Sequence, residues 1–155
     1  MSTASQKSIL IYESHLEIST DLSEINRVLQ WFEEFEHKNL AADMLWKIRI
    51  ALIEGFTNAV RHAHENKPES TPIIIDGFLY AKKLEIHIWD CGEAFDLAEL
   101  INTVEKKYPN PEEHDAHWGG TIFRKLTLEH GWVIHYQCSK NSEADRNCLT
   151  LQIPL

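Results

Sequence analysis

Three polar side chains recur every four residues in the stretch Glu54-Gly55-Phe56-Thr57-Asn58-Ala59-Val60-Arg61-His62. On an α-helix, this spacing would place Glu54, Asn58 and His62 on one face. The amide oxygen of Asn58 suits a hard cation such as Mg²⁺, and Glu54 could accept the proton of an attacking hydroxyl group. The pattern could serve a site for Mg·ATP, although by itself it fits the solvated edge of an ordinary helix better.

A second polar group, Asp90-Cys91-Gly92, directly follows the stretch Leu84 to Trp89, which is typical of a strand. Loops at strand ends often hold functional groups. The carboxylate of Asp90 can accept a hydrogen bond from the exocyclic amine of adenine. Gly92 has no Cβ atom and would let the backbone approach a purine. Alone, D-x-G also describes a simple turn.

A third group, Trp118-Gly119-Gly120-Thr121, opens a predicted helix that runs to His130. Glycines at a helix N-terminus expose backbone N–H groups, and the helix dipole adds positive potential, so this end suits a phosphate group. A flexible loop followed by Thr121 as an N-cap is an equally good interpretation of this segment alone.

The elements that must position these groups follow from the apolar patterns along the chain. Asp21 with Glu24 predicts a capping box, and the helix that follows has its apolar residues at helical spacing. We expect further helices over Leu40–Ala63, Asp96–Val104 and Thr121–His130, and strands over Ser8–Ile18, Ile73–Tyr80, Lys83–Asp90, Trp132–Cys138 and Cys148–Ile153. Grouped helices with hairpin-linked strands predict a two-layer α/β sandwich, and residues 1–155 fit one domain.

The composition argues against several classes of function. The chain has 15 Lys and Arg against 24 Asp and Glu, for a net charge of −9, and it has no basic block, so direct nucleic-acid binding is not expected. It has no apolar run of about 18 residues and no apolar N-terminal segment, which predicts a cytosolic protein without membrane attachment. Three cysteines without a CxxC pair, and histidine pairs without a third ligand, do not indicate a transition-metal site.

The three groups occur in one order along the chain: E-x-x-x-N-A-x-x-H, D-x-G-x-x-F, and a glycine loop before a helix. Together they resemble the N, G1 and G2 boxes of the Bergerat-fold, or histidine-kinase-like, ATPases. Within that superfamily, the short length and Asn58-Ala59 followed by His62 most resemble the anti-sigma-factor serine kinases. The resemblance extends from about Ser8 to Leu155, and it implies a mixed, largely antiparallel sheet with ATP and Mg²⁺ as cofactors.

The resemblance also implies roles for individual residues. Glu54 matches the family's general base, Asn58 its magnesium ligand, and Asp90 its adenine-reading aspartate. The further ATP-binding residues implied by the three boxes are His62, Gly92, Phe95, Gly119, Gly120 and Thr121. His117 stands where the family has the first glycine of its phosphate loop, which puts phosphoryl transfer in more doubt than nucleotide binding.

The function implied by the resemblance is that of an anti-sigma regulatory factor. Such a protein sequesters a sigma factor and phosphorylates a serine of an anti-anti-sigma protein, its antagonist. Arg27, at the distance from Glu54 that matches a sigma-contacting arginine of the family, is the predicted partner-binding residue. The alternative is a nucleotide-binding module that regulates a partner without phosphoryl transfer. The sequence leaves the oligomeric state open, with a homodimer as one option.

Overall fold

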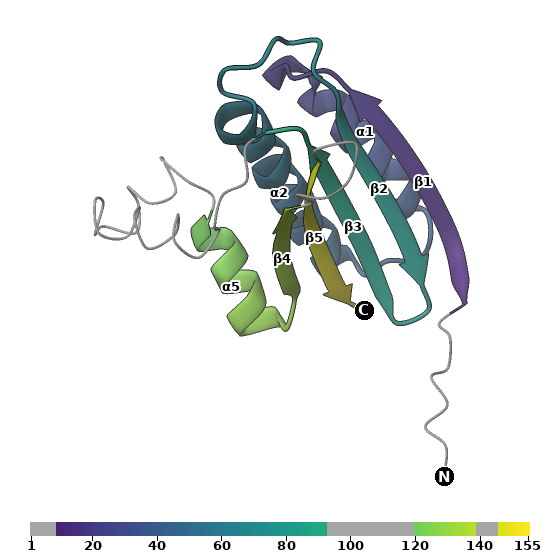
Figure 1. The fold of residues 1–155 in the computed structure, drawn as a ribbon. Coiled ribbons are helices and arrows are strands. Elements are labelled where there is room, and N and C mark those ends of the chain that lie inside the picture. The colour runs from purple at the N-terminus through teal and green to yellow at the C-terminus, as the bar shows by residue number, and fades with distance from the viewer. Residues whose placement is uncertain (1–8, 93–119, 139–145) are drawn as a thin grey trace.

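The computed structural model describes residues 9–92, 120–138 and 146–155 (Figure 1). Its main feature is a five-stranded open sheet in the order β1-β2-β3-β5-β4. Each pairing between described strands is antiparallel, so the parallel component of the predicted mixed sheet is not found among them. The strands are β1 (Leu10–Ile18), β2 (Ile73–Tyr80), β3 (Lys83–Asp90), β4 (Val133–Cys138) and β5 (Asn147–Pro154).

The helices form the second layer of the predicted α/β sandwich, which is thereby confirmed. Figure 1 shows α1 and α2 across one face of the sheet and α5 beside β4. Their bounds are α1 (Ile25–Glu36), α2 (Ala42–Asn58) and α5 (Gly120–His130), with a 3₁₀ turn η1 (Leu22–Glu24) before α1 and a π-turn η2 (Ala59–Ala63) after α2. No helix of the described segments is long and apolar enough to cross a membrane. The helix predicted over Asp96–Val104 lies outside the described residues.

The core forms between the helices and one face of the sheet. Along β2 and β3, side chains alternate between buried and half-buried positions, as the period of two of a strand requires. The helices contribute apolar stripes at a spacing of three and four residues. The buried residues of α1 are Val28, Trp31, Phe32 and Phe35, and those of α2 are Ile48, Ala51, Leu52, Gly55, Phe56 and Asn58. Asn58 is the one polar side chain in this set of buried helix residues.

Two local predictions for the helices require correction. Asp21 accepts a hydrogen bond from the Ser23 backbone N–H (2.9 Å), but Glu24 pairs with Arg27 (2.9 Å), so the reciprocal capping box is not formed and the first turn is 3₁₀. The helix predicted to run from Leu40 to Ala63 is α-helical only to Asn58, and it continues as the π-turn η2. Since π-turns often occur at functional sites, the change of geometry directly after Asn58 is notable.

Candidate functional site

The end of α2 lies directly against the end of β3. A Cβ atom at Gly55 would be 2.5 Å from Cδ1 of Ile88, so helix and strand approach closely there. Four residues beyond Ile88, the backbone of Gly92 packs on the backbone of Ala63, the last residue of η2. The segment from Gly55 to Ala63 therefore follows β3 to its end, and the structure brings the Glu54–His62 stretch and Asp90 to the same end of the sheet.

Asp90 is a buried carboxylate, 3% exposed, that is held by three donors. Its Oδ1 accepts from the backbone N–H of Gly92 (2.9 Å) and from Nδ2 of Asn147 (3.0 Å), and its Oδ2 accepts from the hydroxyl of Tyr136 (2.7 Å). Asn147 also donates to the carbonyl oxygen of Gly92 (2.8 Å). Asn147 and Tyr136 come from strands that the sequence analysis did not connect with this site, because only the sheet order brings them there.

Gly92 is required for a reason that the sequence did not reveal. A Cβ atom at this position would be 2.2 Å from the carbonyl oxygen of Ala63 and 2.7 Å from its carbonyl carbon. A backbone obstacle of this kind cannot move aside as a flexible side chain can. The glycine thus lets the loop after β3 pack against η2, whereas the prediction that it makes room for a purine stays a prediction.

Asn58 is 8% exposed, and its Nδ2 atom has no hydrogen-bond partner among the described residues. A buried N–H group left unpaired costs free energy on the order of 1–3 kcal/mol, so it requires an explanation, and a bound ligand is one. An amide offers both an oxygen for a hard cation and an N–H donor for an anion. The donor chemistry of Asn58 therefore fits Mg²⁺ together with a phosphate group.

Glu54 and His62 differ in how they relate to Asn58. Glu54 lies one α-helical turn before Asn58 and is half-buried, in agreement with the predicted shared face. His62 lies in the π-turn η2, which has more residues per turn than an α-helix, and it is exposed. Glu54 and Asn58 are therefore one α-helical turn apart as predicted, whereas His62 follows in a turn of different geometry.

His64 is a functional candidate that the sequence analysis considered only as a weak metal ligand. It is 2% exposed and joins three segments of the chain. Its Nδ1 lies 2.7 Å from Oγ1 of Thr20, its Nε2 accepts from the backbone N–H of Cys91 (2.8 Å), and Thr20 donates to the carbonyl oxygen of Thr71 (2.6 Å). Among the described residues, no group of three His, Cys, Asp or Glu side chains could hold a metal ion.

The predicted phosphate-binding segment is described only in part. Gly120 and Thr121 form the first turn of α5, while Phe95, His117 and Gly119 lie outside the described residues. Nζ of Lys47 in α2 lies 3.4 Å from Nδ1 of His130, at the last residue of α5. α5 begins on the side where α2 ends (Figure 1), which directs its N-terminus toward the end of the sheet that contains Asn58.

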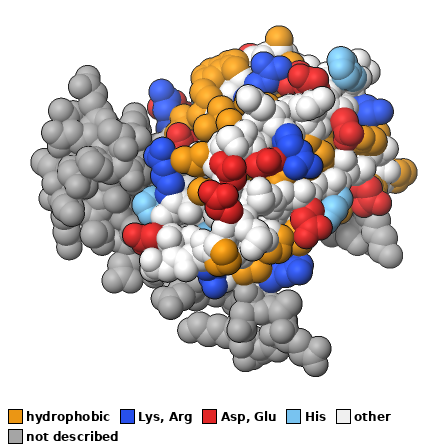
Figure 2. Space-filling model, turned by 90° about the horizontal axis from the view of Figure 1, so that it is seen from above, with side chains coloured by type: hydrophobic (Ala, Val, Ile, Leu, Met, Phe, Trp, Pro, Cys, Tyr) orange, Lys and Arg blue, Asp and Glu red, His pale blue; other side chains and the backbone are white. Residues whose placement is uncertain are grey.

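The end of the molecule that contains this site has a mixed surface. Viewed from the end where β3 finishes, the basic side chains of the described part are separated from one another by acidic and apolar ones (Figure 2).

Arg27, the predicted partner-binding residue, lies in the first turn of α1 with its side chain 57% exposed, and it pairs with Glu24. Arg27 is therefore accessible to a partner.

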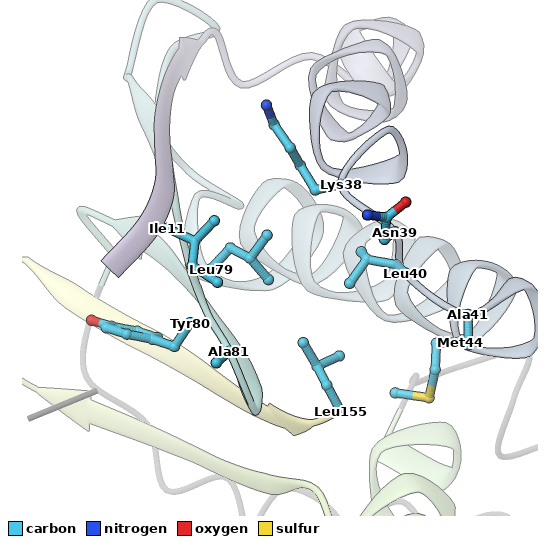
Figure 3. Close-up of a pocket in the computed structure, with 10 residues that line it drawn as sticks. All are labelled: Ile11, Lys38, Asn39, Leu40, Ala41, Met44, Leu79, Tyr80, Ala81 and Leu155. Atoms are coloured by element: carbon cyan, nitrogen blue, oxygen red, sulfur yellow. The ribbon is translucent and has the colours of Figure 1, made fainter. Parts of the chain in front are cut away.

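A pocket of about 430 Å³ lies at the opposite end of the sheet, where β2 ends and β3 begins (Figure 3). Its walls are mainly apolar and come from β1, the α1–α2 connection, the β2–β3 turn and the last residue of the chain. The lining residues are Ile11, Lys38, Asn39, Leu40, Ala41, Met44, Leu79, Tyr80, Ala81 and Leu155. None of the predicted site residues lines this pocket.

The family model of the histidine kinase-like ATPase domain matches residues 18–153. The chain belongs to this family. Over 73 residues it is 36% identical to the serine-protein kinase RsbW of Oceanobacillus iheyensis. That alignment covers 47% of this chain and 46% of the relative, so the chain spans about half the length of this curated protein.

Two solved structures are similar in fold. The catalytic domain of the histidine kinase ThkA is 22% identical, with a TM-score of 0.54 and coverage of 91% of this chain and 95% of that one. The mycobacterial sensor histidine kinase MprB is 12% identical, with a TM-score of 0.52 and coverage of 90% and 97%. At these identities the likeness establishes the histidine-kinase-like ATPase fold and nothing finer.

Proposed function

We propose that the chain binds Mg·ATP at the end of the sheet where β3 finishes and transfers the γ-phosphate to a serine of an antagonist protein. The observation that carries this proposal is the buried Asn58, whose Nδ2 has no partner among the described residues, at the same end of the sheet as the buried carboxylate of Asp90. The similarity to a serine-protein kinase supports phosphoryl transfer as the reaction. The antagonist would be an anti-anti-sigma protein, and the second activity would be sequestration of a sigma factor.

Asp90 would recognise the adenine base. A carboxylate offers about four lone-pair sites, and three protein donors occupy the two oxygens of Asp90, with Tyr136 the one on Oδ2. The exocyclic amine of adenine can therefore donate to Oδ2 beside the Tyr136 hydroxyl. Guanine presents a carbonyl oxygen at the corresponding position, and two acceptors would then face each other, so the site should prefer adenine.

Glu54 and Asn58 would act at the phosphate end. Bound Mg²⁺ would offset the negative charge of the phosphates. The amide oxygen of Asn58 would face the cation, which leaves its Nδ2 to donate to a phosphate oxygen. Glu54 would accept the proton of the attacking serine hydroxyl. The serine oxygen then bonds to the γ-phosphorus, the bond from that phosphorus to the bridging oxygen breaks, and ADP departs.

Transfer is tested with γ-labelled ATP, Mg²⁺ and an anti-anti-sigma protein from the same genome. We expect label on one serine of the antagonist, and no label when that serine is replaced by alanine. An antagonist that stays unlabelled while Mg·ATP binds would support the second candidate function, a nucleotide-binding module that sequesters its partner. His117 in place of the first loop glycine favours this second candidate, whereas Glu54 favours the kinase because a binding module needs no base.

Arg27 would contact the sigma factor. Its exposed position in the first turn of α1 leaves the guanidinium accessible, and Glu24 holds it at 2.9 Å. We expect Arg27→Glu to weaken sigma-factor binding at least tenfold because the substitution reverses the charge. Arg49→Glu, which alters an exposed arginine of α2 that pairs with Glu36, is the matched control. Equal binding by the parent and Arg27→Glu in a pull-down titration would contradict the assignment.

A further inference from the structure

We propose that His64 is a positioning residue for the nucleotide-binding loop Asp90–Gly92, and that it acts only as the neutral tautomer with its proton on Nδ1. The proposal rests on the proposed nucleotide function of Asp90. His64 is buried and contacts the loop at Cys91, the residue between Asp90 and Gly92. Within the described segments its ring nitrogens face Thr20 and the backbone of Cys91, so its effect on binding would be indirect.

The hydrogen bonds define the tautomer of His64. The backbone N–H of Cys91 can only donate, so Nε2 must be the unprotonated nitrogen that accepts from it at 2.8 Å. The proton of the neutral ring is then on Nδ1. Thr20 uses its hydroxyl proton toward the carbonyl oxygen of Thr71 at 2.6 Å, which leaves its oxygen to accept from Nδ1 at 2.7 Å. Each donor in this chain of bonds has one acceptor.

This chain of bonds connects the loop to two other segments. Thr20 lies between β1 and η1, and its backbone N–H donates to the carbonyl oxygen of Glu69 at 2.8 Å. His64 directly follows η2, whose last residue, Ala63, packs on Gly92. The loop after β3 is thus held twice by this part of the chain, through the imidazole at Cys91 and through the backbone contact at Gly92. Loss of the imidazole bond should let Asp90 move relative to Asn58.

Protonation of His64 would remove the bond to Cys91, because both ring nitrogens then donate and an N–H group would face an N–H group. Burial lowers the pKa of His64, the charge of Asp90 from β3 acts in the opposite direction, and Lys67 lowers it further. The neutral form therefore prevails above the ordinary histidine value of 6.5. The bond should be complete above that pH, and it should be lost as the pH falls below it through the lowered pKa of the folded protein.

Two variants distinguish the hydrogen bonds made by the His64 side chain from the protonation of its ring. In His64→Gln, the amide oxygen can accept from Cys91 and the amide N–H can donate to Thr20, but the side chain does not titrate. In His64→Leu, both bonds are absent. We expect His64→Leu to bind Mg·ADP roughly five- to thirtyfold more weakly at about pH 7.5, since a buried N–H loses its acceptor. His64→Gln should bind within about threefold of the parent there. His37→Gln, at the exposed end of α1, is the control.

The pH dependence of Mg·ADP affinity tests the proposal, because a role of His64 in stability alone would leave that dependence unchanged. Between about pH 7.5 and pH 4.5, the parent and His37→Gln should lose more affinity for Mg·ADP than His64→Gln, whose side chain at position 64 cannot be protonated. Calorimetry at several pH values gives the ratio of the Mg·ADP affinities at the two ends of this pH range. Parallel profiles for the parent and His64→Gln, or full affinity in a folded His64→Leu protein, would overturn the proposal.

Amide hydrogen exchange at Cys91 distinguishes failure of this proposal from failure of the proposed function. Protection of the Cys91 N–H should be high in the parent and in His64→Gln, and low in His64→Leu, without any nucleotide present. If this pattern holds but no variant binds Mg·ADP, the nucleotide assignment is wrong while the positioning of the loop stands. If Cys91 exchanges equally in all three proteins, the positioning role is wrong even if nucleotide binds.

Discussion

The two ends of the sheet differ in the groups that the described residues place there. At the end where β2 turns into β3, a pocket of about 430 Å³ has mainly apolar walls and none of the residues with candidate chemistry. At the other end, Asp90, His64 and Asn147 are all buried and hydrogen-bonded, and the Nδ2 of buried Asn58 has no partner within the described ranges. Among the described residues, this pocket and the groups with candidate chemistry therefore lie at different ends of the sheet.

The difference shows which property is more informative about function here. An apolar pocket costs little to leave open at the margin of a small domain. Buried polar groups cost free energy unless they are paired, so their concentration at one place requires a reason. The hydrogen bonds around Asp90 hold a carboxylate in one orientation, which is what recognition of one base edge needs. We therefore assign the nucleotide to the polar end rather than to the pocket.

The largest expected effect is that of Glu54→Gln on phosphoryl transfer. The substitution keeps the shape of the side chain but removes its capacity to accept a proton. Labelling of the antagonist should fall about 10²–10⁴-fold, while Mg·ATP affinity stays within about threefold. Asp43→Asn, in the first turn of the same helix, is the control and should transfer at the parental rate. Parental transfer by Glu54→Gln would show that Glu54 is not the base.

Asp90→Asn should have the next largest effect, on nucleotide affinity. The new amide NH₂ group would face the donors of Asn147 or Tyr136. The side chain would also keep only one oxygen that can accept a hydrogen bond from adenine. Mg·ATP binding should weaken by about 1–3 kcal/mol. The matched control is Asp76→Asn on the opposite face of the sheet, where Trp89 donates to the carboxylate (3.1 Å). Calorimetry that gives both variants the same affinity would contradict the role of Asp90.

Asn58→Leu should separate stability from function at the polar end. Because Nδ2 of Asn58 has no partner in the described structure, an apolar side chain of similar size should leave the free energy of unfolding unchanged or raise it by up to about 1 kcal/mol. Affinity for Mg·ATP should nevertheless fall by about 1–2 kcal/mol. Urea unfolding and calorimetry measure the two quantities. A strongly destabilised variant would mean that Asn58 is a structural residue.

Met44→Ala, at the apolar pocket, should have the smallest effect on nucleotide binding. Met44 is half-buried, so its truncation should lower the free energy of unfolding by about 1–2 kcal/mol. Mg·ATP affinity should change less than twofold, since distant sites usually act independently. A loss of affinity as large as that of Asp90→Asn would indicate that the pocket, not the polar end, binds the nucleotide.

The sequence predicted the elements better than it predicted their junctions. Alternation in β2 and β3, and helical spacing in α1, are local patterns, and they indicated the two layers correctly. The π-turn after Asn58 was not predicted, and the packing of its last residue, Ala63, against Gly92 is a tertiary contact that no local pattern reveals. The partners of Asp90 were missed for the same reason, since Tyr136 and Asn147 are adjacent to it only through the sheet order.

His64 was the largest omission among the candidate site residues. Beside the exposed His62, it gives no spacing signal, and the pair of histidines was considered only as a metal site and discounted because no third ligand joins it. Only the fold reveals that the ring of His64 is buried between Thr20 and Cys91. Motifs thus predicted the residues expected to touch the nucleotide, whereas the residues that hold them in place follow from tertiary packing.

The assignment of Mg·ATP to the polar end is tested most directly by NMR titration of the ¹⁵N-labelled protein with a non-hydrolysable Mg·ATP analogue. The account predicts that the largest shift changes occur at the side-chain amide of Asn58 and at the backbone amides of Cys91 and Gly92. The amides of Asn39, Ala81 and Leu155 at the apolar pocket should change little. Changes confined to the pocket residues, or no change at saturating analogue, would contradict it.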